Sequence, residues 1–151
     1  MNETDNNVAI VLLVEDNPGD VLLIQEVLGG NNGHFDLHVV KDGAEAMLYL
    51  KSVLAESGKS KLPNMIILDL NLPRKNGREV LANIRSDENL RDLPVIIFTS
   101  SDAEEDILIC QHLNVVKYYK KPIDFDEYVS TIKAIEGSII ALVNSKGPAS
   151  N

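Results

Sequence analysis

The sequence contains a single cysteine, Cys110, and no long run of apolar residues. One thiol cannot form an internal disulfide or supply a thiolate metal site, which is typical of proteins in a reducing compartment. The longest strongly apolar segment, residues 8–14, is far shorter than the roughly 20 residues that cross a bilayer. Residues 1–7 are polar and acidic, and they lack the basic flank and apolar stretch of a signal peptide. We therefore expect a soluble, cytoplasmic protein that does not insert into a membrane.

An excess of basic residues is also absent, since 14 Lys+Arg face 23 Asp+Glu and the formal net charge is -9. A surface this negative repels phosphate backbones, which argues against direct nucleic-acid binding. Phosphate-binding loops are missing too, because neither G-x-x-x-x-G-K-[ST] nor G-x-G-x-x-G follows the first apolar segment. The composition therefore disfavours nucleic acids and nucleotides as ligands and favours cations wherever carboxylates converge.

The length and composition are those of one ordinary globular domain with a substantial core. The chain has 151 residues, of which 44% are hydrophobic and 25% charged. We expect a flexible leader at 1–7, the domain at 8–136, a C-terminal helix extension at 137–145 and a disordered tail at 146–151.

Five predicted strands alternate with five predicted helices. We place the strands at 8–14, 35–40, 65–68, 94–98 and 115–119. The helices open at Asp20, at Asp42-Gly43, beyond Gly77, after a cap at Asp102, and near Phe125. This alternation predicts an α/β fold in which right-handed crossovers join the strands of a parallel sheet.

Asp69 lies at the centre of this organisation. It follows the apolar run 65–68, whose lack of polar alternation indicates a strand buried on both faces. Pro73 and Asn76-Gly77 then end the regular structure. In open α/β sheets, ligands bind where strands end. Asp69 could equally be a cap of the next helix, and this stretch alone does not decide between the two.

Three other predicted strands end in residues with functional chemistry: Glu15 and Asp16 after the first, Thr99 on the fourth, and Lys121 after the fifth. A parallel sheet brings these ends together beside Asp69 along one edge. Thr99 could instead be a turn residue, and Lys121 a solvated charge. Their joint placement favours a common site.

Crowded carboxylates raise each other's pKa unless a cation neutralises them. Oxygen ligands of this kind suit Mg²⁺, which retains waters that a phosphate oxygen can displace. We expect Asp16, Asp69 and the backbone carbonyl of Asn71 to bind the metal, with Glu15 acting through a water.

A carboxylate can also attack phosphorus and form an acyl phosphate. Lys121 and Thr99 would then contact the oxygens of the transferred group, while the metal offsets its charge.

The motifs together resemble the receiver domain of two-component response regulators, over residues 8–135. They are Glu15-Asp16 after an apolar strand, Asp69 in D-L-N-L-P-R-K-N-G, Thr99 after P-V-I-I-F, and Lys121-Pro122. The stretch D-L-N-L-P-R-K-N-G-R-E-V-L is also similar to the small stand-alone regulators that serve phytochrome-type histidine kinases. The resemblance implies a flavodoxin-like (βα)5 fold, a doubly wound parallel five-stranded sheet with strand order 2-1-3-4-5.

For the site, the resemblance implies that Asp69 accepts a phosphoryl group from the phosphohistidine of a sensor histidine kinase. It implies a signalling phosphoacceptor rather than an enzyme, one that assists its own phosphorylation and dephosphorylation. Thr99 would swing toward the phosphoryl oxygen, and Tyr118, at the family's switch position, would turn inward with it. Lys121 would form the ion pair to phosphate, and Lys121-Pro122 would be a cis peptide. Tyr118 could instead be ordinary edge-strand packing.

We expect the signal to leave through the surface of the fourth helix, fifth strand and fifth helix, toward a downstream protein target. The apolar stripe of the last helix continues past Gly137 through Ile139, Leu142 and Val143. The resemblance ends near Ile135, so we expect this extension to have little core left to cover. Exposed apolar surface often marks an interface, and we predict a homodimer that involves the extension.

Two other functions fit parts of the pattern. A phosphatase with an aspartyl nucleophile usually carries a second Asp two residues later as general acid, and Asn71 occupies that position. A receiver-like scaffold that binds partners without phosphorylation is the other, and the intact set of site residues argues against it.

Overall fold

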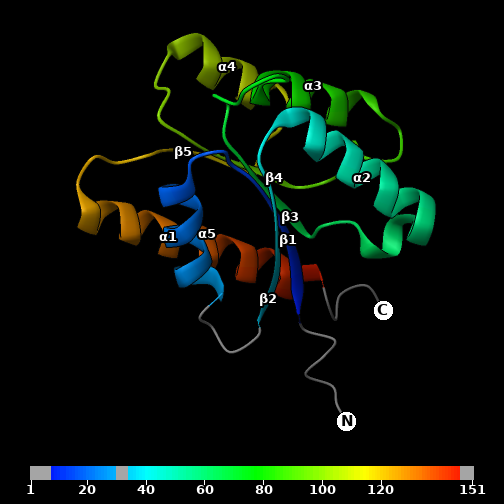
Figure 1. Cartoon of the computed structure of the whole chain (residues 1–151), viewed down its shortest axis with the longest axis horizontal. Coiled ribbons are helices and arrows are strands. Elements are labelled where there is room, and N and C mark those ends of the chain that lie inside the picture. Colours follow the sequence, from blue (N-terminus) through cyan, green and yellow to red (C-terminus); the bar gives the residue numbers. More distant parts are fainter. Residues whose placement is uncertain (1–7, 30–33, 147–151) are drawn as a thin grey trace.

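The computed structural model describes residues 8–29 and 34–146. They form one five-stranded sheet of order β2-β1-β3-β4-β5 in which every neighbouring pair is parallel (Figure 1). This confirms the prediction of a doubly wound parallel sheet, including its strand order. The predicted leader 1–7 and the tail beyond residue 146 lie outside the described residues.

The elements lie close to their predicted positions. In chain order they are β1 (Ala9–Val14), α1 (Pro18–Gly29), β2 (Phe35–Val40), α2 (Gly43–Ser57), η2 (Gly58–Lys61), β3 (Met65–Leu68), α3 (Gly77–Ser86), β4 (Val95–Thr99), α4 (Glu104–His112), β5 (Lys117–Lys120) and α5 (Phe125–Lys146). The short 3₁₀ helix η2 directly follows α2. The strand predicted at 115–119 is shifted, because β5 pairs with β4 from Lys117 to Lys120.

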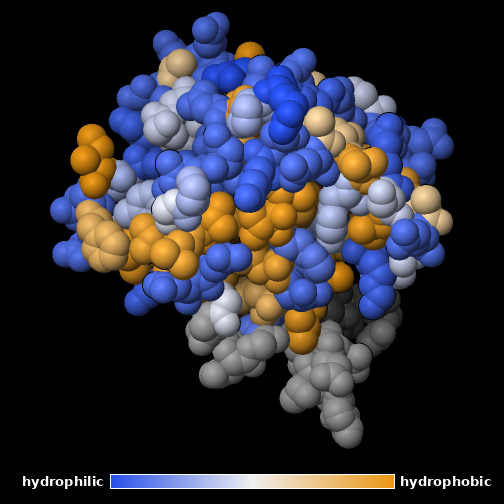
Figure 2. All heavy atoms as spheres, in the orientation of Figure 1, coloured by the Kyte–Doolittle hydropathy of each residue, from blue (hydrophilic) through white to orange (hydrophobic). Residues whose placement is uncertain are grey.

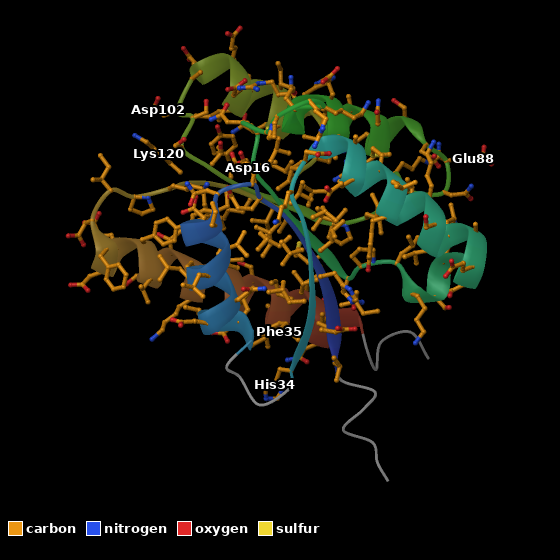
Figure 3. The ribbon with its side chains drawn as sticks, viewed as in Figure 1. Asp16, His34, Phe35, Glu88, Asp102 and Lys120 are labelled. Atoms are coloured by element: carbon orange, nitrogen blue, oxygen red, sulfur yellow. The ribbon has the colours of Figure 1, made fainter. Side chains whose placement is uncertain are left out.

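The start of α4 differs from the prediction for a physical reason. Asp102 does not cap this helix, whose N-cap residue is Ala103 without a side-chain hydrogen bond. The Asp102 carboxylate instead accepts a hydrogen bond from Lys120 Nζ at 3.1 Å. Figure 3 shows the two labelled side chains close together at the upper left of the molecule.

Two cores cover the two faces of the sheet. Leu12 and Val14 of β1 point into a core shared with α2, α3 and α4, while Val11 and Leu13 point into a core shared with α1 and α5. Figure 1 shows the same division, with α1 and α5 on one side of the strands and α2, α3 and α4 on the other. Because both faces are buried, the central strands read as continuous apolar runs.

The C-terminal extension is packed against the domain to a degree that we did not predict. Helix α5 continues without a break through Gly137. Ile139 is fully buried in the same core as Ala9 and Phe35, so the expectation that the extension has little core left to cover is wrong. The first residues of β1 and β2 extend the core beneath it. Ile140 alone among the large apolar residues of the extension is strongly exposed within the described part of the chain.

Helices long and apolar enough to span a membrane are absent from the described residues.

Candidate functional site

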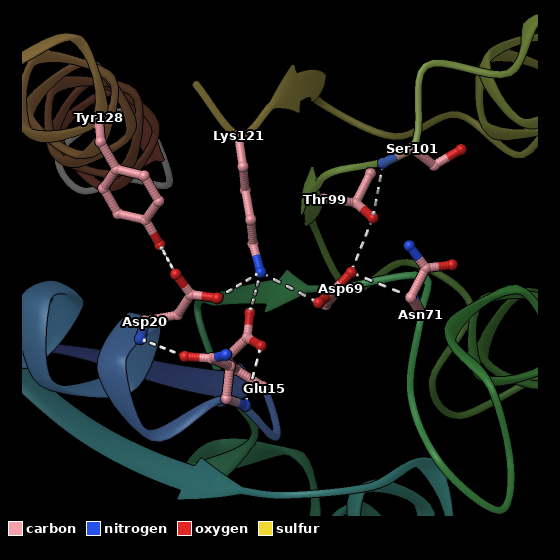
Figure 4. Close-up of polar contacts among 9 residues, drawn as sticks. Glu15, Asp20, Asp69, Asn71, Thr99, Ser101, Lys121 and Tyr128 are labelled. Atoms are coloured by element: carbon pink, nitrogen blue, oxygen red, sulfur yellow. Dashed lines mark hydrogen bonds and ion pairs between the residues drawn. The ribbon is translucent and has the colours of Figure 1, made fainter. Parts of the chain in front are cut away.

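Asp69 follows β3 directly and is held in place by its backbone and by its side chain. Its N–H donates to the carbonyl of Val14 at the end of β1. Asp69 Oδ1 accepts hydrogen bonds from Thr99 Oγ1 at 2.7 Å and from the Asn71 N–H at 3.1 Å, and Oδ2 accepts one from Lys121 Nζ at 3.1 Å (Figure 4). The residue is only 5% exposed. The carboxylate is therefore fixed by three donors at the carboxyl edge of the sheet, as predicted from the strand ends.

The alternative that Asp69 caps the next helix is wrong. Helix α3 begins with Asn76 as its N-cap, and Asn76 forms a reciprocal capping box with Glu79. The helix nevertheless comes close to Asp69, because Gly77 packs directly against the backbone of Asp69 and Leu70. A side chain at position 77 would displace the segment that carries the carboxylate.

Lys121 connects three carboxylates, which lie after β1, on α1 and after β3. Its Nζ donates to Glu15 Oε1 at 2.8 Å, to Asp20 Oδ2 at 2.8 Å and to Asp69 Oδ2 at 3.1 Å. Burial alone would lower the pKa of Lys121, but the bonds to Asp20 and Glu15 and the charges of Glu15 and Asp69 raise it above its ordinary value. The side chain is 11% exposed, so the alternative of a solvated end-of-strand charge is excluded. Lys121 stays protonated and points at the Asp69 carboxylate.

Glu15, Asp16 and Asp69 form the acidic cluster that we predicted. Each of the three offers a carboxylate oxygen, and these oxygens lie within 4.8 Å of one another. Burial, together with the charge of Asp69, raises the pKa of Glu15 to about 7 although the bond from Lys121 opposes this. Three converging carboxylate oxygens are a donor set that a hard divalent cation fits, and the charge of such a cation would favour the ionised form of Glu15. Figure 3 shows Asp16, the exposed member, near the carboxyl ends of the strands.

Thr99 and Tyr118 are linked through Ser101. Thr99 is fully buried at the end of β4, and its Oγ1 also accepts from the Ser101 N–H at 3.4 Å. Tyr118, on β5, is half-buried and donates its hydroxyl hydrogen to the carbonyl of Ser101 at 2.8 Å. Thr99 is thus a direct partner of Asp69 rather than a turn residue only. A continuous chain of hydrogen bonds joins Asp69 to the predicted switch residue.

The prediction of a cis peptide between Lys121 and Pro122 is wrong, since the described residues contain no cis peptide bond. A following proline reduces the preference for trans but does not remove it. Asn71 contacts Asp69 through its N–H, and the role of its carbonyl as a metal ligand stays a prediction.

Two residues of the site were not predicted from the sequence. Asp20 binds Lys121 and also accepts a hydrogen bond from the Tyr128 hydroxyl. Asp20 was predicted to be the first residue of a helix. The helix dipole is sufficient to explain an acidic residue at that position. For Tyr128 the hydroxyl was the available signal, because a buried Tyr hydroxyl usually finds a partner.

A second network beside the site was also missed. Arg78 on α3 binds Asp106 on α4 through two parallel bonds of 2.7 Å and donates to the carbonyl of Leu70 at 3.3 Å. Ser101 Oγ donates to the same Asp106 carboxylate at 2.6 Å. The hydrogen bonds from Arg78 lower the pKa of Asp106 to about 2, with a further contribution from Ser101 and despite burial. The network joins α3, α4 and the loop that carries Ser101.

We expect Asp106→Asn to destabilise the protein at neutral pH by roughly 1–2 kcal/mol. A drop of the Asp106 pKa from 3.8 to about 2 corresponds to about 2 kcal/mol, which solvent at the partly exposed Arg78 reduces. Because the folded-state pKa is depressed, this stabilisation is fully present above about pH 4 and disappears as the pH falls toward 2. Urea unfolding of both proteins at pH 7 and at stepwise lower pH measures the difference.

Asp102→Asn is the matched control, because Asp102 lies just before α4 and forms an exposed pair with Lys120. Exposed pairs contribute little to stability, so no measurable change is expected. A loss for Asp106→Asn that equals the loss for Asp102→Asn, or that does not change with pH, would contradict this interpretation.

Comparison with known proteins agrees with this site. The model of the response regulator receiver domain family matches residues 11–133. The response regulator Rcp1 of Synechocystis is 38% identical over 136 residues, which cover 90% of this chain and 92% of that protein. The crystal structure of the Mn²⁺-bound form of Rcp1 superposes with a TM-score of 0.77 over 85% of this chain and 92% of the other. The phosphorylated cyanobacterial phytochrome response regulator RcpA, 40% identical, gives a TM-score of 0.78 over 85% of this chain and 91% of its own.

Proposed function

The chain belongs to the response regulator receiver domain family, and from this premise we propose that Asp69 accepts a phosphoryl group from the phosphohistidine of a sensor histidine kinase. The observation that carries the proposal is the set of donors around Asp69. Thr99 Oγ1, Lys121 Nζ and the Asn71 N–H all reach its carboxylate within 3.1 Å. The hypothesis of a phosphatase has no comparable support, because the residue two positions after Asp69, where such an enzyme needs a second acid, is Asn71.

In the proposed reaction an Asp69 oxygen forms a bond to phosphorus while the phosphorus–nitrogen bond of the phosphohistidine breaks. The imidazole nitrogen leaves with the electron pair and regains a proton. Lys121, which stays protonated, then donates to an oxygen of the transferred group, and the Thr99 hydroxyl donates to another. Both donors already lie beside the carboxylate, so little reorganisation is needed.

We propose Mg²⁺ as the cation of the acidic cluster. Asp16, Asp69 and the Asn71 carbonyl would hold it, with Glu15 supporting it through a water. Bound there, the metal would offset the negative charge of the phosphoryl oxygens. The Mn²⁺-bound form of Rcp1 supports a divalent cation in this family, and the all-oxygen donor set favours Mg²⁺ over softer metals.

Incubation with acetyl phosphate and Mg²⁺, followed by intact-mass measurement, tests the proposal. We expect a gain of one phosphoryl group per chain, and we expect chelation of the metal with EDTA to prevent it. No gain in the presence of Mg²⁺, with the chain folded, would contradict the proposed function. An equal gain in EDTA would contradict the metal requirement.

The kinase is proposed to approach over the carboxyl edge of the sheet. Ile123 is fully exposed and Phe125 is 61% exposed, both where the chain passes from β5 into α5 beside Lys121. Figure 2 shows hydrophobic surface at this place on the left of the molecule. Leu22 on α1 is 56% exposed. The likeness to RcpA supports a phytochrome-type kinase as donor.

The output surface is proposed to be α4, β5 and α5. Leu108 and Ile109 on α4 and Val116 before β5 are exposed apolar residues on this side, which suits a downstream protein partner.

A homodimer remains part of the proposal, with Ile140 as the exposed residue of the extension. Sedimentation of the phosphorylated and unphosphorylated samples from the experiment above tests it, and a monomer in both would contradict it. Ile140→Ser is a better probe than truncation, which would remove the buried Ile139.

A further inference from the structure

The lysine of the site is held by more contacts than its proposed partner Asp69 requires. An ammonium group has three donors, and Lys121 uses them on Glu15, Asp20 and Asp69. Figure 4 shows Asp20 on the side of Lys121 opposite to Asp69. Asp20 therefore binds the lysine without facing the acceptor carboxylate.

Asp20 is itself anchored from the opposite end of the chain. The Tyr128 hydroxyl on α5 donates to Asp20 Oδ1, while Asp20 Oδ2 accepts from Lys121. The Tyr128 ring packs edge-on against Phe98, with ring centroids 5.3 Å apart, and Tyr128 is 8% exposed. The centroid of the Phe98 ring in turn lies 5.8 Å from Lys121 Nζ. The tyrosine is thus fixed by packing, and its hydroxyl fixes the carboxylate that holds the lysine.

This arrangement matters because a lysine side chain is long and flexible. Its four-carbon stem loses considerable rotamer freedom when the ammonium group is held at one point. When Asp69 carries a phosphoryl group, the bond from Lys121 to Asp69 Oδ2 has to pass to a phosphoryl oxygen. The bonds to Asp20 and Glu15 do not involve Asp69, so they can persist and keep Nζ in reach.

We propose that Asp20 and Tyr128 are positioning residues that hold Lys121 Nζ where it contacts the phosphoryl group on Asp69. The inference rests on the proposed function. It adds two residues to those that the site requires, beyond the acceptor, the metal ligands and the lysine. The pair acts through Lys121 and touches neither the phosphoryl group nor the metal.

The test uses Tyr128→Phe, which removes the hydroxyl and keeps the ring against Phe98. Beryllofluoride serves as the probe, because it mimics a phosphoryl group on a carboxylate. We expect its affinity, measured at saturating Mg²⁺, to fall about threefold to tenfold, the range for one net hydrogen bond. The affinity for Mg²⁺ alone is expected to be unchanged, because Tyr128 does not contact the acidic cluster. A general loosening of the fold would weaken both, and that result would overturn the proposal.

Tyr119→Phe is the matched control. It removes the hydroxyl of a half-buried tyrosine outside the site, which contacts α5 through Ser138 Oγ at 3.3 Å. Its beryllofluoride affinity should equal that of the unmodified protein. Equal losses in both variants, or no loss in Tyr128→Phe, would contradict the proposal.

A double-mutant cycle with Asp20→Ala separates a direct role of Tyr128 from one that passes through Asp20. If Tyr128 acts through Asp20, Tyr128→Phe has no further effect on beryllofluoride affinity once Asp20 is replaced. Independent, additive losses would contradict the proposed order. The outcome is distinct from a failure of the proposed function, since in that case the unmodified protein would neither bind beryllofluoride nor accept phosphate from acetyl phosphate.

Discussion

Replacing Asp69 with asparagine is expected to abolish phosphoryl acceptance while leaving the protein folded. The amide has nearly the volume of the carboxylate, and its oxygen can still accept from Thr99 and the Asn71 N–H. It carries no negative charge, however, and is too weak a nucleophile to attack phosphorus. Treatment with acetyl phosphate and Mg²⁺ should therefore give no mass gain in Asp69→Asn, and thermal unfolding should remain cooperative.

Asp42→Asn is a suitable control for this result. Asp42 is another buried carboxylate, which caps α2 and binds Arg74, and it lies outside the acidic cluster. We expect this variant to be less stable but to gain the phosphoryl group as the unmodified protein does. An equal gain in Asp69→Asn, or a selective loss in Asp42→Asn, would place the acceptor elsewhere.

Replacing Gly77 with alanine is expected to impair both stability and phosphoryl acceptance. The added methyl group would overlap the carbonyl oxygen of Asp69 and lie 2.6 Å from Leu70 Cα. These are backbone atoms, so relief requires movement of the segment that carries the acceptor. We expect a destabilisation of about 1–3 kcal/mol. A displacement of Asp69 near 1 Å would lower the phosphorylation rate by roughly a hundredfold. Urea unfolding and the time course of mass gain measure the two effects.

Gly43→Ala provides the comparison that separates position from stability. A methyl group there would overlap the carbonyl oxygen of Lys75 and lie 2.7 Å from its carbonyl carbon, so a similar loss of stability is expected. The strain falls at Lys75, toward the end of the loop that begins after Asp69. The rate of phosphorylation per folded molecule should therefore change little. If the two variants lose rate in proportion to stability, the close approach of Gly77 has no specific role at the site.

Most of the fold and the acceptor site could be predicted because their signals are local. The run 65–68 is apolar at every position because β3 is buried on both faces, and Asp69 follows it directly. A parallel sheet then required Glu15, Asp16, Thr99 and Lys121 to meet at one edge, and they do. In these places the order of elements and the strand ends were sufficient.

The contacts that were missed join distant parts of the chain. Asp20 and Tyr128 are separated by 108 positions, and each has an ordinary local explanation as a helix start or a core residue. Ile139 is buried because it shares a core with the first residues of β1 and β2. The apolar stripe of the helix alone does not reveal this contact. Asp102 was predicted to cap a helix, but β5 places Lys120 within hydrogen-bonding distance of its carboxylate. In each of these cases the outcome depends on a contact between different elements, which the local sequence pattern does not show.

Chemical mapping of the phosphorylated residue shows directly whether Asp69 is the acceptor. Borohydride reduces the acyl phosphate of an aspartate side chain to an alcohol, which converts that residue to homoserine. After treatment with acetyl phosphate, Mg²⁺ and borohydride, peptide mass spectrometry should find homoserine at position 69 and aspartate at positions 16 and 20. Homoserine at another position, or a phosphoryl group carried by a histidine or serine, would contradict the account.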